Sequence, residues 1–195
     1  MRWFFGTLVT LLVLIGVYAG SAVVSLNGLV EAARAGNGVE ILARTDVPRL
    51  KHSLVDQIVS GYLIRTGQDR PIKPLERMVA NTYGASIADA LVAKMLTSEN
   101  LTNMLQKGTL AIGSSTEANM LSLGEIDTST VFGVLRRFSL VKPVEFSIRL
   151  GDNDSSGAIS LHFEGDGWKL SGVQLPAAAV QALAQTLPEN KGRKG

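Results

Sequence analysis

The sequence predicts an α+β protein with an N-terminal transmembrane helix, a helical layer, an antiparallel β-meander and a short C-terminal helix. Three observations predict this class. An uncharged apolar run begins near the N-terminus, apolar residues recur at helical spacing through the first half of the chain, and apolar and polar residues alternate towards its end. The expected division is an anchor or signal peptide over residues 1–26, a single α+β domain over 27–188 and a basic disordered tail over 189–195.

The first apolar run, from Trp3 to Leu26, is long enough to cross a membrane. Its 24 uncharged residues would span roughly 36 Å as a helix rising about 1.5 Å per residue, against about 30 Å for the hydrocarbon core. A cleaved secretory signal is the alternative, because small residues stand at 19–22. The run continues past them to Leu26, which favours an uncleaved single-pass anchor. Arg2 and the terminal amine favour a cytoplasmic N-terminus, and this would place the domain outside the cytoplasm.

Composition excludes several classes of site and partner. The chain has no Cys, so it can form neither a disulfide framework nor a thiolate metal site. It has 19 Lys and Arg against 17 Asp and Glu; four of the basic and one of the acidic residues lie outside 27–188, which leaves 15 against 16 in the domain. Aromatic residues make up only 6% of the chain. Since there is no basic stripe interleaved with aromatics, we expect no nucleic-acid partner.

Helical segments follow the anchor, separated by turn-forming and capping residues. The sequence Gly36-Asn37-Gly38 predicts the end of the helix that begins in the anchor, because Gly and Asn tolerate the left-handed conformation. Asp46 and Ser98 are expected N-caps, and Gly108 is expected to end the last of these helices. The expected helices span 39–43, 47–65, 75–96 and the short stretch before Gly108, with a loop at 67–74 and a loop or irregular crossover at 109–130.

Near the C-terminus the pattern changes to alternation of apolar and polar residues, which predicts strands. Three such segments joined by short turns predict an antiparallel meander. A strand near 132–141 is expected as a fourth, and 177–187 as a closing helix. Gly172 interrupts the alternation in the last strand and predicts a β-bulge. The three alternating segments are 144–150, 158–164 and 168–175.

The alternation assigns one face of the meander to the core. The residues on this face are Val144, Phe146, Ile148, Leu150, Ile159, Leu161, Phe163, Trp168, Leu170 and Val173. We expect the face to be covered by apolar side chains of the two longer helices. These are Leu54, Ile58, Met78 and Leu91.

Four stretches of the chain resemble the bacterial domain of unknown function 2939 family. They are the N-terminal apolar helix, EAARAGNGVEILARTDVPRLKHSLVDQI, LTSENLTNMLQKG and the closing strand WKLSGVQLP, and together the resemblance covers most of residues 1–176. The Thr-Pro-Glu usual in the family is Thr97-Ser98-Glu99 here. The resemblance implies a membrane-anchored or exported bacterial protein and carries over no catalytic residue. The order of helices followed by a meander is also similar to cystatin-like rolls, which is a likeness of fold alone.

Two features suggest a metal ion, and a simpler explanation is favoured for both. The loop from Asp152 to Gly157 resembles the start of a calcium loop, but its twelfth position, where a bidentate acid belongs, is Phe163. A hairpin turn rich in turn-forming residues explains this loop. His52 and His162, the two histidines of the chain, are expected to be ordinary surface residues. We therefore expect no metal site, no cofactor and no catalytic residue.

An apolar cavity between the sheet and the helices remains as a candidate site. Trp168, Phe146 and Phe163 are the residues expected to line it, with the indole N–H free for a partner. The expected function is a non-enzymatic binding or assembly role for a domain anchored in the bacterial inner membrane and facing the periplasm or cell exterior. Its partner would be an unknown protein or small molecule. The alternative is a small-molecule-binding protein or enzyme that uses this cavity.

Overall fold

The computed structural model describes residues 2–69, 74–112, 116–119, 122–123, 138–151, 157–165 and 167–187. The expected calcium-like loop at 152–156, the expected tail at 189–195 and residues 132–137 of the expected fourth strand lie outside this part. The helices are α1 (Arg2–Arg34), α2 (Gly38–Ala43), α3 (Val47–Asp69), α4 (Pro74–Met95), α5 (Ser98–Lys107) and α7 (Ala177–Thr186). The strands are β1 (Thr109–Ile112), β2 (Thr116–Asn119), β3 (Phe138–Lys142), β4 (Glu145–Arg149), β5 (Ala158–Glu164) and β6 (Gly167–Gln174). The predicted α+β class is confirmed.

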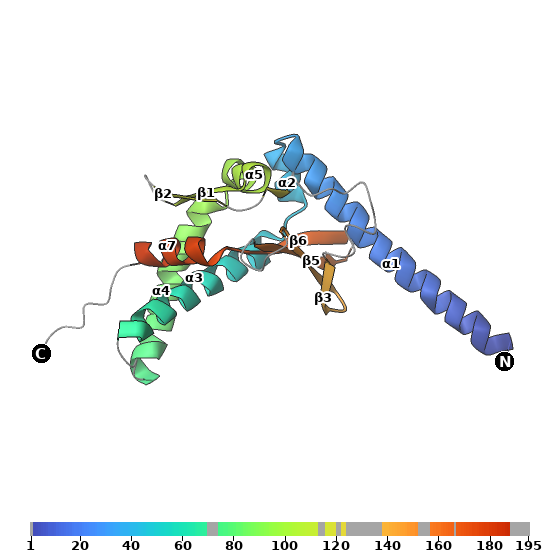
Figure 1. Cartoon of the computed structure of the whole chain (residues 1–195), viewed down its shortest axis with the longest axis horizontal. Helices are drawn as coiled ribbons and strands as arrows, with labels where there is room; N and C mark the ends of the chain where they lie inside the picture. The colour runs from blue at the N-terminus through green and yellow to red at the C-terminus, as the bar shows by residue number, and fades with distance from the viewer. Residues whose placement is uncertain are drawn as a thin grey trace, which may run out of the picture.

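Helix α1 is one continuous helix of 33 residues, about 50 Å long at 1.5 Å per residue. Its N-terminal half projects away from the rest of the molecule, whereas its C-terminal half passes beside the sheet (Figure 1). By length and composition, Phe5–Arg34 could cross a membrane. The helix stops before Gly36, which adopts a φ of 64°, as the sequence predicted. The side chains from Phe5 to Val17 are exposed, and burial begins at Tyr18.

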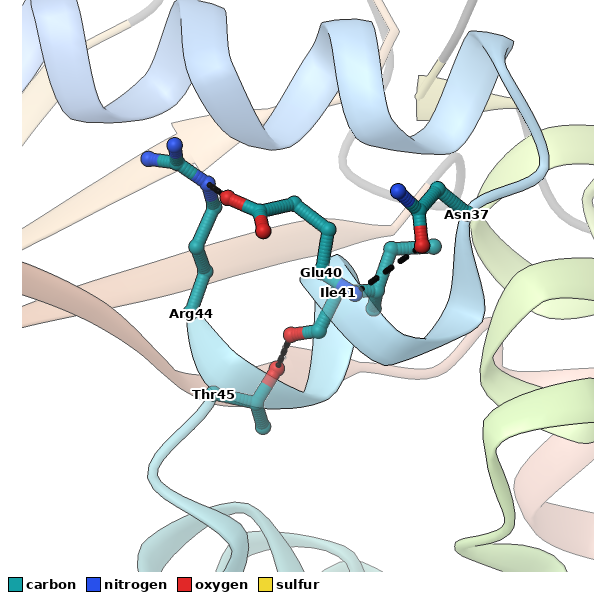
Figure 2. A network of polar contacts seen from close by, with 5 residues as sticks. All are labelled: Asn37, Glu40, Ile41, Arg44 and Thr45. Atoms are coloured by element: carbon teal, nitrogen blue, oxygen red, sulfur yellow. Dashed lines mark hydrogen bonds and ion pairs between the residues drawn. The ribbon is translucent and has the colours of Figure 1, made fainter.

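Helix α2 and its capping residues connect α1 to the edge of the sheet. The Asn37 side chain accepts a hydrogen bond from the Glu40 N–H at 3.2 Å and caps the helix, and the Arg44 guanidinium pairs with Glu40 at 2.7 Å (Figure 2). The Thr45 hydroxyl donates to the carbonyl of Ile41 at 2.7 Å. Beyond the helix, Thr45 forms a parallel bridge with Leu170 of β6. The chain is therefore held against the outer edge of β6 just before α3 begins.

Two predicted helix boundaries were wrong. Helix α3 does not end at Arg65 but continues through Gly67 to Asp69, although a Gly inside a helix costs about 1 kcal/mol relative to Ala. The N-cap of α5 is Thr97, not Ser98: Thr97 has extended backbone and its hydroxyl accepts from the Asn100 N–H at 3.2 Å. The predicted cap at Asp46 is confirmed by a bond of 3.1 Å from the Arg49 N–H.

The expected loop at 109–130 was wrong in its first part, where β1 and β2 form an antiparallel hairpin. Each strand has only four residues, too few for an alternating pattern to stand out in the sequence. The hairpin follows α5 directly, because Gly108 in the left-handed conformation ends that helix.

The main sheet is the predicted antiparallel meander, with strand order β3-β4-β5-β6. Its register places Phe146 opposite Leu161 and Phe163 opposite Trp168, so the predicted apolar face is confirmed for these strands. A register shift between Ser160 and Leu161 leaves an extra residue in β6 beside Gly172, which confirms the predicted bulge. Val144 was assigned to this face wrongly, because it lies in the β3–β4 turn and is 41% exposed.

Two helices, α1 and α3, pack against β6, the edge strand of the meander. Leu54 and Ile58 of α3 are buried in one core with the sheet, as predicted, and Leu91 of α4 packs against this core; the side chain of Met78 lies outside the described part. Helix α3 also runs along the edge of β6, where the amide of Gln57 donates to the Val173 carbonyl and accepts from the Leu175 N–H, both at 2.8 Å. The sequence did not predict that α1 supplies part of this core. Its buried residues there are Ala22, Leu26, Leu29, Val30, Ala32 and Ala33.

Candidate functional site

The three aromatic residues expected to line a cavity meet on the apolar face of the sheet, and Tyr18 of α1 packs among them. Ring centroids of Trp168 lie 4.7 Å from Phe146, 5.4 Å from Phe163 and 5.1 Å from Tyr18. Trp168 is only 4% exposed. We call Tyr18, Phe146, Phe163 and Trp168 the aromatic cluster.

Polar contacts fix α1 against the aromatic cluster. The indole N–H of Trp168, which the sequence left without a partner, donates to the Ser21 hydroxyl at 2.9 Å. The Tyr18 hydroxyl donates to the carbonyl of Pro143 in the β3–β4 turn. Tilted and edge-on ring pairs each add about 0.5–1.5 kcal/mol beyond the area they bury. The cluster therefore joins the apolar N-terminal helix to the sheet with defined geometry.

We expect Phe163→Ala to destabilise the protein by about 2–4 kcal/mol, because the ring contacts Tyr18 and Trp168 but is itself only half-buried. Ser160→Ala, on the opposite face of the same strand, should cost under about 1 kcal/mol. Urea denaturation of the full chain in detergent, followed by circular dichroism, measures both values. Equal losses would show that the apolar face of β5 has been assigned incorrectly.

A second candidate site is a groove of about 610 Å³ between α3 and the polar face of the sheet. Both histidines border this groove, although they are 110 positions apart in the sequence. The residues that line it include Arg49, His52, Ser53 and Asp56 from α3, and Lys142, Glu145, Ser160, His162 and Gly172 from the sheet. The bulge in β6 brings Gly172 beneath Ser53, and a Cβ at position 172 would lie 3.2 Å from the Ser53 hydroxyl.

Two side chains in the groove lie close to carboxylate groups. Lys142 lies 3.6 Å from Glu145, and His52 lies 3.4 Å from Asp56 on an exposed part of α3. The Nδ1 atom of His162 is buried and has no hydrogen-bond partner within the described structure. An imidazole nitrogen can donate or accept a hydrogen bond, according to its tautomer. The described residues contain no group of three His, Cys, Asp or Glu side chains placed to hold a metal ion.

The sequence predicted that Trp168, Phe146 and Phe163 would share one face of the sheet, but it did not predict the groove. The signal was the polar half of the strand alternation, which places Glu145, Ser160 and His162 on one face. Nothing in the sequence indicated that His52 of α3 would lie beside that face, because α3 was expected to cover the other one. Because α3 lies along the edge of the sheet, Leu54 and Ile58 pack into the core on the apolar face, while His52 and Asp56 border the groove on the polar face.

One protein-family model matches this sequence. The model of a family described as "Protein of unknown function (DUF2939)" matches residues 11–104. This match spans most of α1, all of α2, α3 and α4, and part of α5. Searches of curated proteins and of solved structures gave no match.

Proposed function

Residues 11–104 of this chain belong to the DUF2939 family, and from this premise we propose that the protein is a membrane-anchored bacterial protein whose α+β domain faces the periplasm or cell exterior. Its role is binding or assembly and not catalysis. We further propose that the anchor and the domain meet inside α1, at Tyr18, and not at the end of the apolar run.

The proposal is supported above all by the burial of the second half of the apolar helix in the domain core. Ala22 and Leu26 are fully buried, and the Ser21 hydroxyl accepts from the Trp168 indole. Cleavage near residues 19–22 would remove Tyr18 and uncover the aromatic cluster. A helix whose loss uncovers the core is expected to stay on the mature protein, and this favours an anchor over a cleaved signal peptide.

The continuity of α1 also supports an assembly role. No flexible linker separates the exposed residues Phe5–Val17 from the domain, so the bilayer and the domain are joined by one helix. A domain held in this way keeps a fixed height and tilt above the membrane, which suits contact with another membrane component. Arg2, on the short N-terminal side, favours a domain outside the cytoplasm.

The experiment combines the mass of the mature chain with reporter fusions at its C-terminus. We expect the purified protein to retain the residues of α1, and a reporter that is active only outside the cytoplasm to be active in the fusion. A matched fusion to a reporter that is active only in the cytoplasm should be silent. A mature chain that begins near residue 22 would contradict the anchor, and an active cytoplasmic reporter would contradict the orientation.

The groove favours a second candidate function, the binding of a small polar molecule between α3 and the sheet. It rests on the volume of the groove and on the buried Nδ1 atom of His162, which has no hydrogen-bond partner among the described residues. Native mass spectrometry of the purified chain should then show a bound small molecule that His162→Ala loses and Val39→Ala, at an exposed position on α2, retains. Identical spectra for both variants would argue against this function.

A further inference from the structure

The turn between β3 and β4 exposes an unusual set of apolar side chains. Leu140 is 63% exposed and Val141 is 53% exposed, and Pro143 and Val144 beside them are exposed as well. The one charged side chain between them, Lys142, lies largely in solvent 3.6 Å from Glu145. Exposed apolar side chains that gather at one place mark an interaction surface more often than scattered ones do. We call residues 140–144 the apolar turn.

The apolar turn lies beside α1 at the level where the helix leaves the domain. The Tyr18 hydroxyl donates to the carbonyl of Pro143, in the middle of the turn. Leu140 is opposite Phe146 in the sheet, and the ring of Phe146 lies 6.3 Å from the ring of Tyr18. In Figure 1, the projecting half of α1 runs to the lower right and β3 points downward, so both extend below β6 in this view. The turn therefore continues the apolar surface that the first half of α1 presents.

The short length of the exposed part of α1 places Tyr18, and the apolar turn beside it, close to the bilayer. The exposed stretch Phe5–Val17 has 13 residues and is about 20 Å long, whereas the hydrocarbon core is about 30 Å thick. Even with residues 2–4 added, the helix before Tyr18 reaches only about 24 Å. For α1 to cross the core, the bilayer must reach Tyr18 or beyond it. A Tyr at that level is typical of the interface between membrane and water.

We propose that the apolar turn inserts into the bilayer leaflet next to the domain, as a second membrane contact beside α1. Leu140, Val141 and Val144 would enter the acyl region, and the ammonium group of Lys142 would reach up to the headgroups on its flexible stem. Two contacts fix the rotation of the domain about the axis of α1, which one helix alone leaves free. The inference rests on the proposed membrane anchor.

The test uses the full chain, which has no natural Cys, in phosphatidylcholine vesicles that contain brominated phosphatidylcholine. Single-Cys variants carry an environment-sensitive fluorophore at Val141→Cys in the turn, at Leu12→Cys in the anchor and at Val39→Cys as the aqueous control. Val39 is 78% exposed and follows the far end of α1, about 24 Å beyond Tyr18 along the helix. Quenching by the brominated lipid reports contact with acyl chains, and quenching by iodide reports contact with water.

We expect the labels at 12 and 141 to lose most of their fluorescence to the brominated lipid, and the label at 39 to lose it only to iodide. If the label at 12 meets lipid while the label at 141 is quenched by iodide as the control is, the anchor stands and the inserted turn is refuted. A label at 141 shielded from both quenchers would mean that protein covers the turn, and would also refute insertion. A label at 12 that meets water, or is lost by cleavage, overturns the anchor and the inference together.

Discussion

A chain shortened to begin at residue 27 is expected to lose about 5 kcal/mol or more of its unfolding free energy, enough to unfold a domain of ordinary stability. The deletion removes the apolar run up to its last residue, Leu26. If the run were only a membrane anchor, this deletion would leave the stability of the domain unchanged. It removes Leu26 and Ala22 from the core instead, together with Tyr18 from the aromatic cluster. Loss of one buried Leu side chain alone costs about 2–5 kcal/mol.

The control is a chain that begins at residue 14, one helical turn before Tyr18. It loses most of the exposed apolar stretch but keeps every contact of α1 with the sheet, so its stability should stay within about 1 kcal/mol of the full chain. Urea titrations followed by far-ultraviolet circular dichroism compare the three chains. A chain from residue 27 that is as stable as the chain from residue 14 would show that α1 does not contribute to the core.

A matched pair of point variants within α1 separates core packing from helix length. Leu26 is buried and Val24, two residues before it, is 72% exposed. The same titrations of Leu26→Ala and Val24→Ala should give a loss of about 2–5 kcal/mol for the first and under about 0.5 kcal/mol for the second.

Trp168→Ala is expected to cost about 3–5 kcal/mol, the largest effect of any single substitution in the aromatic cluster. Its ring contacts the other three rings, and its indole N–H donates to Ser21. Removal would leave a cavity between α1 and the sheet and the Ser21 hydroxyl without its donor. Circular dichroism of the full chain in detergent gives the midpoint without interference from the fluorescence of Trp3.

Trp168→Phe separates the two contributions, since it keeps an aromatic ring and loses the N–H. We expect this variant to cost about 1–2 kcal/mol, of which the lost hydrogen bond accounts for about 0.5–1.5 kcal/mol. If Trp168→Phe were as damaging as Trp168→Ala, the hydrogen bond to Ser21 and not the packing of the rings would hold α1 in place.

Local patterns in the sequence determined most of the elements. Alternation over 158–164 and 168–175 predicted β5, β6 and their buried face, because side chains on a strand alternate between two faces whatever lies beyond them. Glycines at 36 and 108 predicted helix ends, since they adopt left-handed backbone there. These signals depend only on neighbouring residues. The short strands β1 and β2 lacked them, and so did the last turn of α3, which continues through Gly67.

Only the tertiary structure decided what the apolar residues contact. The run from Trp3 to Leu26 looks uniform in the sequence, yet the structure divides it at Tyr18 into an exposed half and a half that packs on the sheet. Likewise His52 and His162 line one groove only because α3 lies along the edge of β6. Burial of an apolar side chain is favourable both in lipid and in a protein core. The residue type alone therefore does not determine which of the two environments surrounds it.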